Sequence, residues 1–220
     1  ILVLAGDIGY PHSKIYVQFL KEVNSKFKKV FLITGNHEYY NKKDIEEVDT
    51  YIQGILQEHQ LSNITFLNCS YEDYEGFRFV GVTLWSHISN PKKTINDMNQ
   101  IHGFTVELNN ELHKVQKEFL SETIESSPLP LIVITHHIPS FTLIDKEFQT
   151  ESMNPYNQCF ASNCELLIKA PVKLWIYGHT HKEHSTEINS VKLVCNPLGY
   201  PSEYWNIDIR DKLKKYIELL

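Results

Sequence analysis

Polar residues able to bind metal ions or move protons follow four short apolar runs of this chain. Each group includes a glycine or threonine at the end of its run: Gly6-Asp7, Gly35-Asn36-His37, Thr135-His136-His137 and Gly178-His179-Thr180-His181. Carboxylate, amide and imidazole ligands mixed in this way suit Mn, Fe or Zn better than Ca or Mg. The four groups therefore predict a metal site.

The apolar runs before these groups have the length and β-branched composition of buried strands. They cover residues 1–5, 30–33, 131–134 and 174–177. In open α/β sheets, ligands gather just beyond the carboxyl ends of the strands, so we expect the four polar groups to converge there. Glycine at such an end lets the backbone turn sharply and lets a ligand approach closely.

Amphipathic segments alternate with the apolar runs, which predicts an α/β protein. Apolar residues at helical spacing predict helices over residues 15–27, 44–60, 107–124 and 165–170. Further strands are expected at residues 64–67, 77–85, 186–188, 191–195 and 205–209, with a polar turn around 72–76 and a surface loop over 138–162. Because no repeat or linker interrupts this pattern, we expect one domain over residues 1–220.

The composition limits the class of protein. With 42% hydrophobic residues, the chain can bury a sizeable core. Its net charge of −6 argues against a protein that binds a nucleic-acid backbone through diffuse positive charge. No run approaches the length of apolar sequence that crosses a membrane. The four cysteines form no CxxC pair, which favours reduced thiols in a cytoplasmic enzyme.

In order and content, the four polar groups resemble the motifs of the calcineurin-like metallophosphoesterase superfamily. That family carries DxH, GDxx(D/E), GNH(D/E), a strand-end histidine and GHxH, in this order. The chain carries GDIGY at 6–10, GNHE at 35–38, THH at 135–137 and GHTH at 178–181. The resemblance spans most of the chain and implies an α/β fold, a four-layer αββα sandwich of two mixed β-sheets flanked by helices.

The resemblance also implies a site with two divalent metal ions, Mn, Fe or Zn. Asp7 would be the carboxylate that bridges both ions, and His181 would belong to the second site. Three residues would complete the first metal site: Asn36, His136 and His179. We prefer His136 to His137 because it is the first residue past the strand, and the choice between them stays open.

The implied activity is hydrolysis of a small phosphoester, a phosphomonoester or a phosphodiester. Two divalent ions lower the pKa of a bridging water, and the resulting hydroxide attacks phosphorus in line. His37 would stand near the leaving-group oxygen and act as general acid, since imidazole exchanges protons near neutral pH. Glu38 is expected to hydrogen-bond within its turn. Substrate specificity is expected to reside in the loops at 86–104 and 138–162.

Two departures from the family pattern bear on these expectations. The second motif ends in Gly9-Tyr10, where many members carry an acidic residue, and the DxH motif would lie on a strand before Ile1. We therefore expect the domain to lack its first strand, and the second metal site to keep only Asp7 and His181. The alternatives are a scaffold that retains the fold without turnover and, ranked last because no HExxH pattern occurs, a mononuclear zinc hydrolase.

Overall fold

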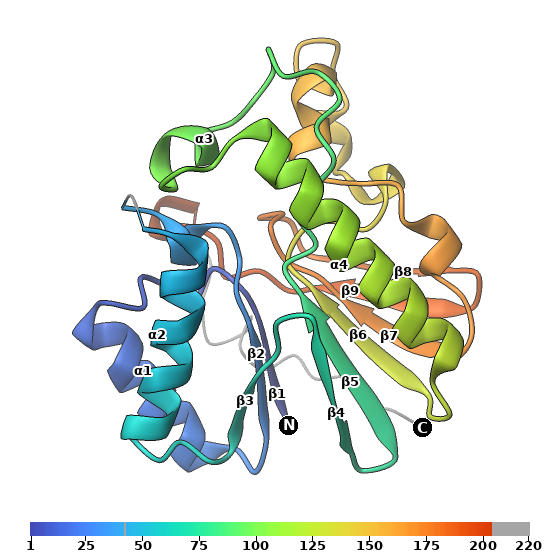
Figure 1. The fold of residues 1–220 in the computed structure, drawn as a ribbon. Helices are drawn as coiled ribbons and strands as arrows, with labels where there is room; N and C mark the ends of the chain where they lie inside the picture. Colours follow the sequence, from blue (N-terminus) through green and yellow to red (C-terminus); the bar gives the residue numbers. More distant parts are fainter. Residues whose placement is uncertain (42, 204–220) are drawn as a thin grey trace.

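Two β-sheets pack face to face in the computed structural model, and helices cover both outer faces (Figure 1). The structure describes residues 1–41 and 43–203, and the strand expected at residues 205–209 lies outside this part of the chain. Within the described residues, no helix has the length and apolar character needed to cross a membrane. The expected four-layer αββα arrangement is confirmed, although of the two sheets expected to be mixed the smaller is parallel in the described residues.

The smaller sheet has the order β1-β2-β3, and both of its strand pairs are parallel. Its strands are β1 (Leu2–Ala5), β2 (Val30–Ile33) and β3 (Ile64–Phe66). The connections between them are α1 (Lys14–Lys26) and α2 (Ile45–Glu58), which lie on its outer face (Figure 1). Parallel pairing places the carboxyl ends of β1 and β2 at the same edge.

The larger sheet has the order β4-β5-β6-β7-β9-β8 and is mixed. Its strands are β4 (Ser70–Tyr74), β5 (Phe77–Val82), β6 (Leu131–Thr135), β7 (Val172–Ile176), β8 (His184–Ile188) and β9 (Val191–Cys195). Strands β5, β6, β7 and β9 run parallel, whereas β4 and β8 pair antiparallel with their neighbours. The carboxyl ends of β6 and β7 therefore also meet at one edge.

The long helix α4 (Val106–Ser126) covers the outer face of the larger sheet, and the short helix α3 (Asp97–Gln100) precedes it (Figure 1). Short 3-10 helices fill the remaining loops: η1 (His37–Tyr39), η2 (Phe141–Leu143), η3 (Lys146–Phe148), η4 (Asn154–Cys159), η5 (Glu165–Leu167) and η6 (Pro201–Glu203). The expected loop at 138–162 thus contains three of these short helices.

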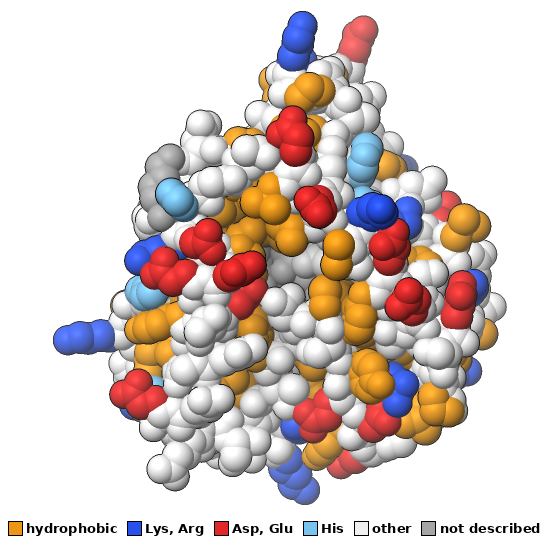
Figure 2. Space-filling view, viewed as in Figure 1, with side chains coloured by type: hydrophobic (Ala, Val, Ile, Leu, Met, Phe, Trp, Pro, Cys, Tyr) orange, Lys and Arg blue, Asp and Glu red, His pale blue; other side chains and the backbone are white. Residues whose placement is uncertain are grey.

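Side-chain oxygens at the N-caps explain where the helices begin. The carboxylate of Asp44 accepts the backbone N–H of Glu46 at 3.0 Å, and acidic residues in the first turn complement the helix dipole. Figure 2 shows acidic side chains gathered over the start of α2. Ser13 and Thr105 cap α1 and α4 in the same way, through the backbone N–H groups of Tyr16 and Leu108.

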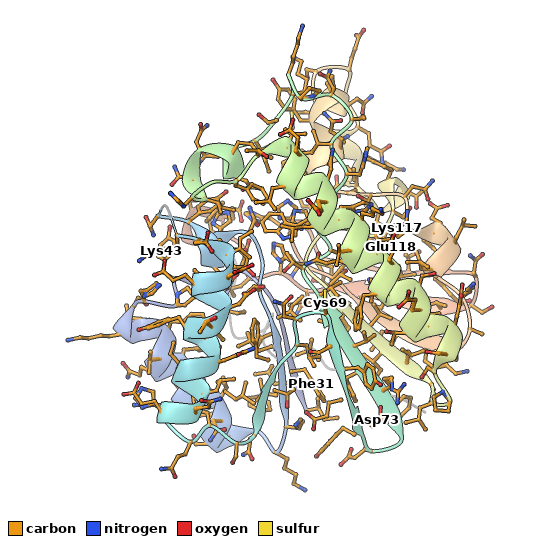
Figure 3. All side chains as sticks on the ribbon, in the orientation of Figure 1. Phe31, Lys43, Cys69, Asp73, Lys117 and Glu118 are labelled. Atoms are coloured by element: carbon orange, nitrogen blue, oxygen red, sulfur yellow. The ribbon has the colours of Figure 1, made fainter. Side chains whose placement is uncertain are left out.

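Alternation along the strands builds the core. Phe31 faces the other sheet and stacks on Phe79 with ring centroids 4.1 Å apart, in the space between the sheets where Figure 3 labels Phe31. Val30 and Leu32 face the opposite way and pack under α1 and α2. A strand buried on both faces reads as a continuous apolar run, which is why β2 was recognisable in the sequence.

Two sequence expectations in this region were wrong in detail. The polar stretch expected as a turn around 72–76 is largely strand β4, and the turn that joins it to β5 lies at Glu75 and Gly76, both with positive φ. The strand expected over 77–85 ends at Val82, because Leu84 takes a φ of 53°. The Thr83 carbonyl then accepts the backbone N–H groups of His136 and His137.

Candidate metal centre

Four side chains, two from each sheet, meet where the strands end. Asp7 follows β1, Asn36 follows β2, His136 follows β6 and His179 follows β7. The Nε2 atom of His136 lies 3.3 Å from Asp7 Oδ2, 3.1 Å from Asn36 Oδ1 and 3.1 Å from His179 Nδ1. The structure thus brings together the four residues that the sequence analysis assigned to the first metal site.

The hydrogen bonds around His136 determine which atom faces the centre. Its Nδ1–H donates to the backbone carbonyl of Ala5 at 2.8 Å, so in the neutral ring Nε2 carries a lone pair. A backbone partner of this kind is how metal-binding histidines usually hold their tautomer. The side-chain amide of Asn36 donates from Nδ2 to Asp97, so its Oδ1 acceptor points at His136.

The charges at this cluster favour a bound cation. Although burial opposes charge on both groups, the attraction between Asp7 and the positive form of His136 lowers the pKa of Asp7 and raises the pKa of His136. Burial lowers the pKa of His179 well below its ordinary value, with the neighbouring histidines adding to the shift. An ionised Asp7 and a neutral His179 are the forms in which these side chains bind a metal ion.

The residues present fit a divalent metal ion. One carboxylate oxygen, one amide oxygen and two ring nitrogens converge, and the ligand atoms of Asp7, His136 and His179 all lie within 4.8 Å of one another. The buried Nε2 of His179 has no hydrogen-bond partner, so the protein leaves this ring incompletely satisfied. Mixed N and O donors of this kind suit Mn, Fe or Zn.

Glycine precedes three of the four residues because the His136 ring, together with nearby backbone or carboxylate atoms, occupies the space a side chain would need. A Cβ atom on Gly35 would lie 2.5 Å from His136 Cε1 and 2.3 Å from Asp7 Oδ1. On Gly6 it would lie 2.6 Å from His136 Nδ1, and on Gly178 3.1 Å from the same atom. The backbone at Asp7 and His179 also takes positive φ. This strained conformation is uncommon in residues other than glycine and clusters at functional sites.

The buried carboxylate of Glu38 joins the loops after β1 and β2. Its Oε2 accepts the backbone N–H groups of Asp7 at 2.9 Å and Gly35 at 2.7 Å, and its Oε1 accepts that of Ile8 at 2.6 Å. Burial, together with the charge of Asp7, raises the pKa of Glu38 to about 7. The bond to Gly35 lies within the turn, as the sequence analysis expected, whereas the bonds to the loop after β1 were not expected.

Three histidines of the motifs lie outside the cluster, and two of them are His137 and His181. His137 is buried, packs against Trp85 and His179, and has its pKa lowered to about 3 by burial and by the adjacent His136. The Nδ1 atom of His181 lies 2.9 Å from Glu203 Oε1. A carboxylate on one ring nitrogen leaves the other available as a ligand, so the role of His181 at a second ion stays a prediction.

His37 lies beside the cluster. Its backbone N–H donates to Asp7 Oδ1 at 3.0 Å, and its ring stacks on Tyr40 at 4.2 Å. The ring of Tyr200 lies 6.2 Å from that of His37 and 4.7 Å from that of His181, with about half of its surface exposed. His37, Tyr40 and Tyr200 therefore form one aromatic wall beside the site.

Sequence reasoning missed two residues that hold the site. Asp97, at the start of α3, accepts hydrogen bonds from Asn36 and Tyr40, and Glu203, in η6, contacts His181. Neither follows a strand, and neither belongs to a family motif. Their only sequence signal is that each is an acidic residue in a segment without helical or strand periodicity.

Comparison with known proteins finds a family and a relative that each match most of the chain. The pattern of the calcineurin-like phosphoesterase family matches residues 1–183. An uncharacterized protein, L509, of Acanthamoeba polyphaga mimivirus is 29% identical over 230 residues, which cover 94% of this chain and 81% of the relative. The similarity therefore extends over nearly all of this chain and about four-fifths of the relative.

Two solved structures have a similar fold. Phosphopantetheinyl hydrolase (PptH) from Mycobacterium tuberculosis superposes with a TM-score of 0.71 at 15% identity, covering 92% of this chain and 80% of that one. The protein TT1561 of Thermus thermophilus superposes with a TM-score of 0.52 at 11% identity, covering 88% and 75%. At these identities the likeness concerns the fold.

Proposed function

The chain belongs to the calcineurin-like phosphoesterase family, and from that premise we propose that it hydrolyses phosphate esters with the help of divalent metal ions. One observation carries the proposal: lone-pair atoms of Asp7, Asn36, His136 and His179 converge at the strand ends. These four residues would hold the first ion. When bound, such ions lower the pKa of coordinated water and offset charge on phosphoryl oxygens.

The protein's own contribution is to fix the geometry around the phosphoryl group. Asp7 offers Oδ2 to the cluster, while its Oδ1 accepts the backbone N–H of His37. This hydrogen bond joins the residue that would bind metal to the residue whose ring would donate the proton. His37 would protonate the departing oxygen as general acid. His181, with its Nδ1 on Glu203, would serve a second ion together with Asp7.

The aromatic wall beside His37 points to the kind of leaving group. Tyr200 exposes about half of its surface, and its ring lies 6.2 Å from that of His37. A leaving group released beside His37 would therefore contact tyrosine rings, which favours aryl or heterocyclic esters. The name of PptH adds phosphopantetheinyl esters to the substrates worth testing.

The test is hydrolysis of p-nitrophenyl phosphate, bis(p-nitrophenyl) phosphate and phenyl phosphate by the 220-residue chain. Mn²⁺, Fe²⁺ and Zn²⁺ are supplied separately, and His59→Ala serves as a histidine control remote from the site. We expect metal-dependent turnover, with His37→Ala losing more activity on phenyl phosphate, whose leaving group needs protonation most. Equal losses of activity on p-nitrophenyl phosphate and phenyl phosphate would show that His37 is not the general acid.

A second candidate is a scaffold that binds one ion without turnover. The clustering of ligands favours it, because Asp7, His136 and His179 lie close together, whereas His181, expected at the second ion, is not part of the cluster found among the described residues. Tight structural metal sites have four ligands as a rule. Binding of Mn²⁺ without hydrolysis of any of the three esters would identify this case.

A further inference from the structure

Asp97 is a buried carboxylate that reaches the site from outside all four motifs. It opens α3, in the loop between β5 and α4, and only 3% of its surface is exposed. An acidic side chain is rarely buried to this extent without partners. Its partners are therefore the first clue to its role.

Its first partner is Asn36. The Nδ2 group of Asn36 donates to Asp97 Oδ1 at 2.8 Å, and the Oδ1 of Asn36 then lies 3.1 Å from His136 Nε2. An amide can present either its oxygen or its NH₂ group to a neighbour, and the hydrogen-bond network decides which. Asp97 accepts hydrogen bonds only, so it selects the orientation in which Asn36 offers oxygen to a cation.

Its second partner is Tyr40. The Tyr40 hydroxyl donates to the same Oδ1 atom of Asp97 at 2.6 Å, and the Tyr40 ring stacks on His37 at 4.2 Å with an interplanar angle of 21°. The Asn36 amide also lies 3.3 Å from the Tyr40 hydroxyl. One carboxylate oxygen thus connects to a residue of the metal cluster and, through Tyr40, to His37.

We propose that Asp97 is a positioning residue for both halves of the site: through Asn36 it orients a metal ligand, and through Tyr40 it holds the ring of His37. The link to His37 rests on the proposed function, whereas the link to Asn36 concerns metal binding alone. Because both hydrogen bonds end on Oδ1, an amide at this position supplies the same acceptor. The role thus requires an acceptor and no negative charge.

Calorimetric titration of the full chain with Mn²⁺ tests the link to Asn36 without turnover. Outer-shell partners of metal ligands typically contribute about 10–100-fold in affinity. We expect Asp97→Ala to weaken Mn²⁺ binding by at least about tenfold and Asp97→Asn to stay within about threefold of the wild type. A folded Asp97→Ala with wild-type affinity, or an Asp97→Asn as weak as Asp97→Ala, would overturn this half of the proposal.

Tyr40→Phe tests the link to His37. This link can therefore be tested even if Asp97→Ala does not fold. It keeps the stacked ring and removes only the hydroxyl that reaches Asp97. We expect Mn²⁺ affinity within about threefold of the wild type and kcat on phenyl phosphate lowered by about 3–10-fold. The loss in kcat should vanish when His37 is already replaced by Ala. An equal loss in the wild-type and His37→Ala backgrounds would contradict the link from Asp97 to His37.

The two readouts also separate this proposal from the proposed function. If no ester is hydrolysed under any condition, the phosphoesterase assignment fails, while the Mn²⁺ titration still decides whether Asp97 orients Asn36. If hydrolysis is observed and a folded Asp97→Ala binds Mn²⁺ like the wild type, the assignment stands and the link from Asp97 to Asn36 is refuted.

Discussion

The Nδ1–H group of His136 donates a hydrogen bond to the backbone carbonyl of Ala5 at 2.8 Å. This bond crosses from the larger sheet to the smaller one, because Ala5 ends β1 and His136 follows β6. It fixes both the tautomer and the direction of the ring. The position of the central nitrogen donor therefore depends on how the two sheets pack.

The first prediction concerns that nitrogen. Replacing His136 by Ala removes a central donor, so Mn²⁺ affinity measured by calorimetry should fall by at least about 100-fold. His59→Ala, in the segment after α2, should leave affinity unchanged. His137→Asn tests the alternative ligand and should cost far less than His136→Ala. A larger loss of Mn²⁺ affinity in His137→Asn than in His136→Ala would identify His137 as the metal ligand.

The second prediction concerns two glycines in opposite surroundings. At Gly35 a methyl group would lie 2.3 Å from Asp7 Oδ1, so Gly35→Ala should destabilise the fold by about 2–4 kcal/mol and abolish Mn²⁺ binding. At Gly54, inside α2, a methyl group meets nothing within 4 Å, so Gly54→Ala should stabilise by about 0.5–1 kcal/mol. Urea unfolding of both variants checks this. Similar effects at the two positions would disprove the steric argument.

The third prediction concerns the pH dependence of stability. Burial raises the pKa of Asp49 to about 6, although the Tyr39 hydroxyl and the Asn68 amide donate to it. The folded state then binds more protons than the unfolded state between the two pKa values, so this carboxyl reduces stability as pH rises from about 4 to about 6. Asp49→Asn removes this titration.

Urea unfolding of the metal-free protein at pH 4, 5, 6 and 7 measures the effect. The stability of Asp49→Asn relative to the wild type should rise across this interval, by on the order of 2 kcal/mol. Gln53→Ala, on the exposed face of α2, removes no titratable group and is the control, so its difference from the wild type should stay nearly constant. A difference that is also constant for Asp49→Asn would mean that Asp49 titrates normally.

The fourth prediction concerns the leaving-group side of the site. Tyr200 exposes 48% of its surface and lies against His37 and His181, so Tyr200→Ala should raise KM for phenyl phosphate by about 3–10-fold. KM for ethyl phosphate should change little, because a short alkyl group cannot reach the ring. Tyr71→Ala, an equally exposed tyrosine on β4, is the control. Equal changes for both esters would exclude aromatic contact.

Much of the fold could be predicted because the strands before the motifs are buried. β2 and β9 match their expected ranges, and the helices at α1, α2 and α4 begin and end within a few residues of expectation. β4 was missed because its alternating residues are largely polar, as befits an edge strand with one exposed face. Hydrophobic periodicity carries no information about such a strand.

The site was predictable where a residue follows a strand, and unpredictable where tertiary contacts bring residues together. Alternation along β6 could also have favoured His136, since it shares the inner face with Ile132 and Ile134, which pack between the sheets. Asp97 lies 61 residues from Asn36, in a segment whose path follows from packing on α4 and the loops. No local pattern could have revealed that contact.

The packing of the His136 ring against Gly6, Gly35 and Gly178 has an evolutionary consequence. A Cβ atom gained at one of these positions would meet the ring and also a second group, which is the Gly35 backbone for Gly6, the Asp7 carboxylate for Gly35 and the Ala5 carbonyl for Gly178. A smaller residue at position 136 would therefore not make room for side chains at the three glycines. In a descendant that had lost the histidine, the glycines would outlast the metal ligand, because backbone contacts would still exclude a side chain at positions 6 and 178.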